Sequence, residues 1–310
     1  MTSAPTPRNL CAELDTLTTE AFRPELAEID QLPTLDIARL MHGEDAAVPA
    51  AVASCLPRIA AAIDATADRM AQGGRLVYAG AGTAGRLGVL DASECPPTFN
   101  TDPSQVVGLI AGGPEAMVTS VEGAEDSREL ARADLDALAL TPTDTVVGVS
   151  ASGRTPYAIG AVEHARAQGA LTIGLACNPG SALAAAADHG IEVVVGPELL
   201  TGSTRLKAGT AQKLVLNMLS TITMIRLGKT YGNLMVDVRA SNDKLRARSR
   251  RIVALATGAD DTDIERALGE AGGEVKTAIL VLLAEVDGPT AARLLEETGG
   301  HLRAALASAT

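Results

Sequence analysis

The sequence predicts an α/β protein with a doubly wound parallel sheet flanked by helices, followed by a small C-terminal all-helical appendage. Short apolar runs typical of buried strands occur at residues 76–79, 106–110, 145–149, 171–176 and 191–195. Segments with helical spacing of apolar residues separate these runs, and such alternation indicates a parallel sheet covered on both faces. From residue 252 onward, short helical patterns are separated by glycines, which predicts the appendage.

The composition fits a helix-rich protein with an aliphatic core. Of 310 residues, 46% are hydrophobic and 2% aromatic, with no Trp, and this length allows a large core. The net charge of −12 argues against nucleic acid and anionic membrane surfaces as partners. The four cysteines form no CxxC pair and the four histidines show no metal-ligand spacing. With no signal-peptide pattern and no long apolar run suggesting a membrane span, we expect a soluble, cytoplasmic protein.

Helices are expected around the strands. Residues 1–14, rich in Pro, Ser and Thr, are expected to be frayed. The predicted helices cover residues 35–41, 47–70 with an interruption at Pro57, 115–138, 156–167 and 211–227. We expect three parts: an N-terminal arm over 1–45, the sheet domain over 46–245 and the helical domain over 246–310.

The segment 74–94 is the centre of the predicted site. A strand is followed by the tight glycine-rich turn 80–85 and then by a helix start at Arg86. Unpaired backbone N–H groups at such a turn, together with the positive end of a helix, suit a phosphate group, and Gly82 and Thr83 are therefore candidates to bind one. Glu94 follows about two turns into the helix, so phosphate binding and proton transfer are expected to share this segment.

A second loop repeats this arrangement. Residues 147–156 (VGVSASGRTP) run from strand through a small, hydroxyl-bearing loop to a helix start, as do residues 77–86 (VYAGAGTAGR). Ser150, Ser152 and Thr155 offer hydroxyl groups, and Arg154 offers a single positive charge. Either loop alone is equally consistent with a plain tight turn. The pair favours two loops that hold a sugar phosphate from two sides.

The sequence fits a dinucleotide site, a nucleotide P-loop or a nucleic-acid surface less well than it fits a sugar-phosphate site. The first loop matches G-x-G-x-x-G, but a dinucleotide fold needs an acidic residue near the end of the second strand, and Glu115 comes only after Pro114. No G-x-x-x-x-G-K-[ST] run is present. The basic run 245–251 has no interleaved aromatic residues and is expected to be a solvated helix face. NAD, a nucleotide P-loop and nucleic acid are therefore not expected.

Several longer segments resemble one family, the N-acetylmuramic acid 6-phosphate etherases of the sugar isomerase (SIS) superfamily. They are GAGTAGRLGVLDASECPPTF (80–99), VEGAEDSRELA (121–131), VSASGRTPY (149–157), ACNPGSA (176–182) and TGSTRLKAGTAQKLVLNMLST (201–221). The likeness runs in the same order from about residue 35 to the C-terminus. One departure is Ala84, where the etherases more often have serine, and this puts one phosphate contact in doubt.

The resemblance implies an SIS-type fold and a carbon–oxygen lyase without a cofactor. The family converts N-acetylmuramic acid 6-phosphate and water into N-acetylglucosamine 6-phosphate and D-lactate, in recycling of cell-wall sugars. In the open-chain sugar, the aldehyde at C1 acidifies the proton at C2, lactate leaves from C3, and water adds back at C3. These steps need proton donors and acceptors, but no metal or redox cofactor. The resemblance also implies a homodimer, and a C-terminal part similar to a ubiquitin-associated (UBA) helical bundle.

The resemblance assigns roles to two glutamates. Glu94 corresponds to the family's proton donor and Glu125 to its catalytic companion. Judged from the residues alone, an ion pair with Arg86 is the favoured explanation for Glu94, and a solvated helix face for Glu125. The resemblance reverses this preference.

The segment 201–213 (TGSTRLKAGTAQK) resembles the one by which SIS isomerases close the sugar site. It adds Ser203 and Lys207 as candidate sugar or phosphate contacts, although solvation of a helix start also explains Lys207. Glu198, just before this segment, is placed like a glutamate that moves protons in those isomerases, and is a reserve candidate for acid–base chemistry or sugar contact. The alternatives to an etherase are an aldose–ketose isomerase and a non-catalytic sugar-phosphate sensor similar to the glucokinase regulatory protein. The joint presence of Glu94 and Glu125 favours an etherase over the sensor.

Overall fold

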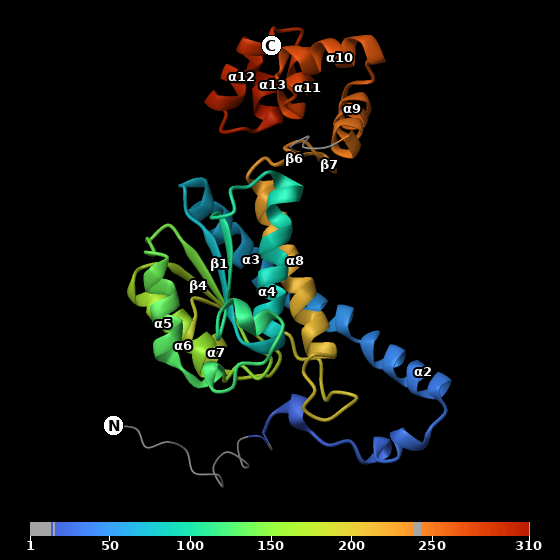
Figure 1. The fold of residues 1–310 in the computed structure, drawn as a ribbon, viewed down its shortest axis with the longest axis vertical. Coiled ribbons are helices and arrows are strands. Elements are labelled where there is room, and N and C mark those ends of the chain that lie inside the picture. The colour runs from blue at the N-terminus through green and yellow to red at the C-terminus, as the bar shows by residue number, and fades with distance from the viewer. Residues whose placement is uncertain (1–13, 15, 239–242, 310) are drawn as a thin grey trace. The chain divides into compact units, whose positions relative to one another are not determined.

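The computed structural model describes residue 14, residues 16–238 and residues 243–309. The chain divides into two compact units, Met1–Ala92 with Val107–Leu219 and Ser93–Val106 with Ser220–Thr310. The first unit holds the parallel sheet and the second holds the C-terminal helices (Figure 1). The expectation of fraying over residues 1–14 falls, apart from Leu14, outside the described residues.

The sheet has the strand order β2-β1-β3-β4-β5. Its strands are β1 (Leu76–Gly80), β2 (Val106–Ile110), β3 (Thr145–Val149), β4 (Leu171–Ala176) and β5 (His189–Glu192). β1 pairs with β3, β3 with β4 and β4 with β5 in parallel. β1, β3 and β4 are buried along their whole length, which agrees with the apolar runs that predicted them.

Helices surround the sheet, so the predicted α/β class with a flanked sheet and a C-terminal helical appendage is confirmed. The helices are α2 (Thr34–Asp45), α3 (Val48–Ala71), α4 (Gly82–Phe99), α5 (Arg128–Ala137), α6 (Pro156–Ala167), α7 (Ala182–Ala186) and α8 (Lys207–Arg226). Short 3-10 turns are η1 (Thr18–Glu20), η2 (Pro24–Leu26), η3 (Ile29–Gln31), η4 (Pro114–Met117) and η5 (Ala124–Asp126). In Figure 1, α5, α6 and α7 lie together on one side of the sheet. Glycines let the helices approach closely: a Cβ at Gly148 would lie 2.7 Å from Val162 of α6, and one at Gly88 of α4 would lie 2.8 Å from Tyr78.

The predicted fifth strand is displaced by a few residues. It was expected at 191–195, but β5 pairs His189 with Ile173 and ends where Glu192 meets Ala176, the last residue of β4. The amide of Val193 donates one further bond to the Ala176 carbonyl at 2.9 Å. The pairing partner, rather than the apolar run, sets the bounds of this edge strand.

The single helix predicted over 115–138 is wrong. Gly123 adopts a left-handed conformation (φ +74°) between the turns η4 and η5, and both turns precede α5. α5 then begins anew because the Ser127 hydroxyl accepts the amide of Leu130 at 3.0 Å as an N-cap. Glu125 therefore sits on a short turn before α5 and not on the face of a long helix.

Three other helix bounds differ from the prediction. α3 continues through Pro57; Cys55 and Ile59 are buried on either side of the proline, and this packing offsets the missing backbone bond. α4 begins at Gly82 instead of Arg86, so the end of the glycine-rich turn is the helix's first turn. α8 begins at Lys207, four residues before the expected start.

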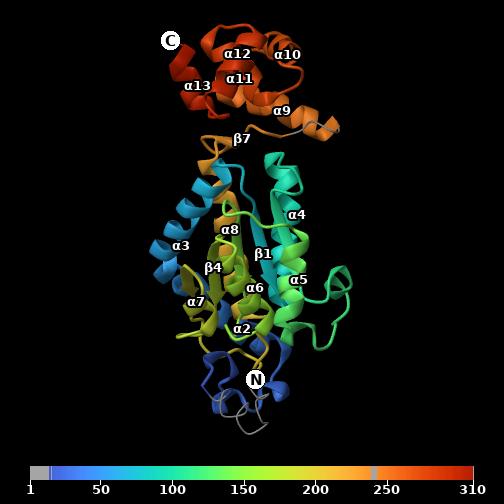
Figure 2. The same ribbon diagram turned by 90° about the vertical axis from the view of Figure 1, so that its left-hand side faces the viewer.

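The C-terminal unit is a helical bundle around its own apolar core (Figure 2). A two-stranded hairpin, β6 (Thr230–Tyr231) and β7 (Leu234–Met235), precedes it. The bundle consists of α9 (Asp243–Thr257), α10 (Asp261–Glu270), α11 (Val275–Ala284), α12 (Gly288–Glu297) and α13 (Leu302–Ala309). The arginines of the basic run are exposed on α9, which confirms the expectation of a solvated helix face.

One helical stretch is more apolar than the sequence patterns predicted. By length and composition alone, the helical stretch Thr34–Ala71 is apolar enough to cross a membrane. Its larger part, α3, packs against β4 and β5 and buries Val52, Ile59 and Ile63. That packing is typical of a core helix that covers a sheet.

We predict that Asp144, which joins the starts of β1 and β3, contributes strongly to stability. Its buried carboxylate accepts the Arg75 amide (2.8 Å) and Arg75 Nη2 (2.7 Å). Burial alone would raise the pKa of Asp144, but the bonds from Arg75 and the Thr141 amide bring it below 3.8. Asp144→Asn should lower the free energy of unfolding at neutral pH by about 3 kcal/mol, measured by urea denaturation.

The pH dependence gives this prediction a second readout. A carboxyl group whose pKa is lowered by folding stabilises the fold above its unfolded pKa, and the contribution disappears as the pH falls through the folded value. The curves of wild type and Asp144→Asn should therefore converge below pH 3.8. Asp68→Asn, an exposed change on α3, is the control, and equal stability of Asp144→Asn and Asp68→Asn at neutral pH would contradict the prediction.

Candidate functional site

A cavity of about 600 Å³ lies in the sheet-bearing unit, beyond the carboxyl ends of β1 and β3. Both predicted loops line it: Gly82 and Thr83 from the first, and Ser150, Ser152, Arg154 and Thr155 from the second. Ligands of open parallel sheets bind at this position. The structure thus brings together the six loop residues that the sequence pattern selected.

The first loop is built for a close approach between strand and helix. A Cβ at Gly85 would lie 2.7 Å from the Gly80 carbonyl oxygen, so only glycine allows α4 to start this near to β1. Gly82 has φ +54° and open space where a Cβ would be. The Thr83 methyl group lies against Gly209 of α8. The first-turn amides of α4 therefore face a cavity that has room for an anion.

The second loop is organised by hydroxyl groups. The buried Ser150 hydroxyl lies 2.8 Å from the Thr155 hydroxyl and 3.2 Å from that of Ser152, and it accepts the Gly153 amide at 3.0 Å. Thr155 is the N-cap residue of α6, yet its side chain makes no capping bond. The first-turn amides of α6 are consequently available to a ligand at the positive end of this helix.

Two carboxylates of the turn η5 also line the cavity, Glu125 and Asp126. Both side chains are exposed, and their turn lies between Gly123 and the cap residue Ser127. Of the two glutamates that the resemblance selected, Glu125 thus shares the cavity with the hydroxyl-bearing loops. Its neighbour Asp126 was not a candidate from the sequence.

Glu94 is exposed on α4 and is not among the residues that line this cavity. It was expected near the glycine-rich loop, but α4 starts at Gly82, so more than three helical turns separate Glu94 from the helix start. Arg86, the alternative partner for Glu94, instead donates Nε to the Met117 carbonyl at 3.0 Å. Of the two glutamates that the resemblance selected, Glu125 is therefore the one found among the described residues of this cavity wall.

Glu198 binds backbone amides at the start of α8. Its carboxylate is 1% exposed and accepts the amides of Lys207 (3.0 Å) and Ala208 (2.9 Å). It thereby caps the start of α8 from outside the helix. Burial raises the pKa of the Glu198 carboxyl, although the two amides act in the opposite direction. The side chain does not line the cavity.

Lys207 and Ser203 also lie away from the cavity lining, whereas their neighbour Thr204 is part of it. The buried ammonium group of Lys207 donates to Glu44 of α2 at 2.5 Å. The same Glu44 carboxylate accepts Arg23 Nη1 at 2.6 Å. Lys207 therefore joins the N-terminal arm to the start of α8, a contact that the local sequence could not indicate.

Sequence reasoning missed the contribution of the N-terminal segment and of α8. Leu14, Leu17 and Glu20 line the cavity, and so does Gln212. Glu20 belongs to a stretch that was expected only to be part of an arm, and Gln212 to a helix expected to be apolar. No local pattern distinguishes these residues, because they reach the cavity only through tertiary packing.

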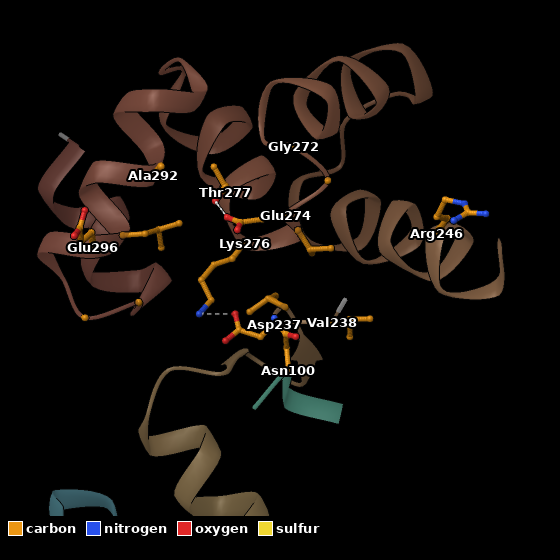
Figure 3. Close-up of a pocket in the computed structure, with 16 residues that line it drawn as sticks. Asn100, Asp237, Val238, Arg246, Gly272, Glu274, Lys276, Thr277, Ala292 and Glu296 are labelled. Atoms are coloured by element: carbon orange, nitrogen blue, oxygen red, sulfur yellow. Dashed lines mark hydrogen bonds and ion pairs between the residues drawn. The ribbon is translucent and has the colours of Figure 1, made fainter. Parts of the chain in front are cut away.

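A larger cavity, of about 830 Å³, lies within the unit of the C-terminal helices (Figure 3). Asp237 lines it and pairs with Lys276 at 2.6 Å and Lys229 at 2.9 Å. No residue that the sequence selected for the site lines it. Among the described residues, no group of three or more His, Cys, Asp or Glu side chains is arranged to hold a metal ion. The smaller cavity is therefore the candidate site.

We predict that Gly153 is indispensable for the second loop. It has φ +68°, and a Cβ there would lie 2.3 Å from the Ser181 Cβ. Gly180 has a similar φ (+62°) but open space around it, so Gly180→Ala is a matched control for backbone strain. Gly180→Ala should cost about 1 kcal/mol of stability. Gly153→Ala should cost several-fold more, measured by thermal denaturation, and should weaken binding of inorganic phosphate, measured by calorimetry. Equal effects of the two substitutions would refute this account.

Comparison with known proteins identifies the family. A model of the glucokinase regulatory protein N-terminal SIS domain matches residues 58–166, and a SIS domain model matches residues 127–222. An N-acetylmuramic acid 6-phosphate etherase of Streptomyces coelicolor is 85% identical over 100% of this chain and 99% of its own. The etherase of Rubrobacter xylanophilus is 62% identical over 94% of this chain and 97% of its own.

The solved structures that are similar to this chain have much lower identity. A phosphoheptose isomerase from Francisella tularensis is 20% identical, with a TM-score of 0.49, and the match covers 63% of this chain and 100% of the other. The full-length relatives carry the assignment. The chain belongs to the N-acetylmuramic acid 6-phosphate etherase family, whose members are enzymes with a SIS domain.

Proposed function

We propose that this enzyme cleaves the D-lactyl ether of N-acetylmuramic acid 6-phosphate and releases N-acetylglucosamine 6-phosphate and D-lactate. The observation that carries the proposal is one cavity whose wall holds both hydroxyl-bearing loops and the carboxylate of Glu125. The family to which the chain belongs supports the choice of substrate. A carbon–oxygen lyase acting on a phosphorylated sugar needs an anion site and a carboxylate within one small space, and this cavity supplies both.

In this proposal, the two loops bind the 6-phosphate group. The anion would lie at the starts of α4 and α6, where backbone amides and the hydroxyls of Thr83, Ser150 and Ser152 are donors. Among the described residues of the lining, Arg154 is the one cationic side chain. A chain with a net charge of −12 has an unfavourable overall field for an anion, so these short-range donors supply the attraction.

The chemistry proceeds by elimination and hydration. A base removes the proton at C2 of the open-chain sugar, the electron pair forms the C2–C3 double bond, and the C3–O bond breaks while an acid protonates the lactate oxygen. Water then adds its hydroxyl to C3 and a proton returns to C2. We assign the base to Glu125 and the acid to Glu94, since each step needs a carboxyl group in a different protonation state.

We further propose that Glu94 reaches the site from a second copy of the chain. Glu94 is exposed on α4, and Leu90, one helical turn earlier, is also exposed (42%). This exposed face of α4 is therefore accessible to another subunit, and the homodimer that the resemblance implies would supply one. A homodimer with two-fold symmetry would use this surface twice and would complete both sites. Sugar phosphates are charged and do not cross membranes unaided, so they stay in the compartment where they are formed. We therefore propose that the enzyme acts in the cytoplasm.

We predict that the purified protein releases D-lactate from N-acetylmuramic acid 6-phosphate. A D-lactate dehydrogenase assay measures the product, and Glu125→Gln should lower the rate by a factor of about 10² or more because the base is lost. Glu122→Gln, an exposed change three residues earlier that does not line the cavity, is the control and should keep most of the activity. Failure of the wild type to release lactate, together with aldose–ketose conversion of hexose phosphates, would show an isomerase instead.

The shared site gives a separate prediction. Glu94→Gln and Glu125→Gln should each be nearly inactive, whereas subunits mixed from the two variants should regain about a quarter of wild-type activity, because half of the dimers are mixed and each has one intact site. The mixture is made by refolding or co-expression and assayed for D-lactate. If both glutamates act from the same chain, no mixed dimer holds an intact site and activity will not return.

A further inference from the structure

Leu14, Leu17 and Glu20 of the N-terminal part form part of the cavity wall, and we infer that the Glu20 carboxylate binds a hydroxyl group of the sugar. This inference rests on the proposed function. Glu20 lines the cavity together with Glu125 and with the two loops that follow β1 and β3, to which we assign phosphate binding. Its side chain is half-buried and makes no hydrogen bond or ion pair with any side chain in the described part of the protein. A sugar hydroxyl is the donor that such a carboxylate lacks.

Asn178 fixes the backbone just before Glu20. Its Oδ1 accepts the Thr18 amide at 2.8 Å and the Thr18 hydroxyl at 2.9 Å, while its Nδ2 donates to the Thr19 hydroxyl at 3.0 Å. Nδ2 also donates to the Ala151 carbonyl in the second phosphate loop at 3.0 Å. Asn178 is 1% exposed and Thr19 is fully buried. This buried network holds the N-terminal segment and the phosphate loop in one arrangement.

Gly202 provides the space that the Glu20 carboxylate occupies. A Cβ on Gly202 would lie 2.5 Å from Glu20 Oε2. The Gly202 amide also donates to the Thr19 carbonyl at 3.2 Å. The backbone just before Glu20 is therefore held by both Asn178 and Gly202, and the carboxylate is directed by packing rather than left on a free arm.

Gln212 supplies an independent sign that this wall contacts a ligand. Gln212 is 1% exposed, lines the same cavity, and its Nε2 is buried without a hydrogen-bond partner among the described residues. An unpaired buried donor costs free energy unless a ligand satisfies it. An acetamido or hydroxyl oxygen of the sugar is an acceptor of the required kind. Glu20 and Gln212 thus complement a sugar that carries both donors and acceptors.

The decisive experiment compares Glu20→Gln with Glu28→Gln in the full-length enzyme. Glu28 is exposed on the same segment of chain and does not line the cavity. With N-acetylmuramic acid 6-phosphate as substrate, Glu20→Gln should raise KM about tenfold at a little-changed kcat, because a charge-assisted hydrogen bond to bound sugar is weakened. Inhibition by inorganic phosphate, which needs only the loops, should keep its inhibition constant.

Several outcomes would overturn the inference. KM values as low in Glu20→Gln as in Glu28→Gln would remove any role in sugar binding. Tighter inhibition by phosphate in Glu20→Gln would place the carboxylate beside the phosphate group, and a fall in kcat at constant KM would make it part of the chemistry. Because wild-type lactate release is measured first, failure of the proposed function is distinguished from failure of this inference.

Gln212→Met tests the second part of the wall. It replaces the unpaired amide by an apolar group of similar size, so the protein's Tm should stay the same or rise. KM for the sugar phosphate should nevertheless increase several-fold. A lower Tm with an unchanged KM would show that Gln212 serves only the fold.

Discussion

The site depends on the register between β1 and β3. Gly80, the last residue of β1, lies opposite Val149, the last residue of β3. The two chains therefore leave the sheet at the same level, and the loops that follow enter one space. A shift of one residue would turn every side chain of a strand to the other face and would carry its loop out of line. The helices α4 and α6 begin directly after these loops, so their positive ends meet at the same cavity.

Polar contacts between distant segments complete this arrangement. Glu198 caps α8. Asn178 joins Thr18 and Thr19 to Ala151 in the loop that follows β3. Both side chains are buried, and their hydrogen bonds satisfy groups that water cannot reach. Such contacts stabilise one position of the N-terminal segment relative to the sheet. They also explain why a conspicuous carboxylate such as Glu198 serves the architecture, although its residue type suggests chemistry.

The cavity wall combines two kinds of group: hydrogen-bond donors that attract an anion, and carboxylates that would repel it. Amides and hydroxyls at the starts of two helices suit an anion without adding net positive charge, which fits an acidic chain. Carboxylates at Glu20 and Glu125 are acceptors for hydroxyl protons or bases for carbon-bound ones. A sugar phosphate carries an anionic end and a hydroxyl-rich body, so both kinds of group find a partner on one molecule.

The sequence by itself determined the class of fold, four strands with nearly correct bounds, and the two strand-to-helix loops that line the cavity. These features depend on local rules: the apolar period, and the small residues that a strand-to-helix turn requires. Only the tertiary structure decided that Glu20 and Gln212 belong to the cavity wall, that Glu198 and Lys207 hold α8, and that Glu94 lies more than three turns from the start of α4. These positions follow from contacts between segments far apart in the chain, such as Thr18 with Asn178, and no local pattern of residues encodes which distant partner a polar side chain will find.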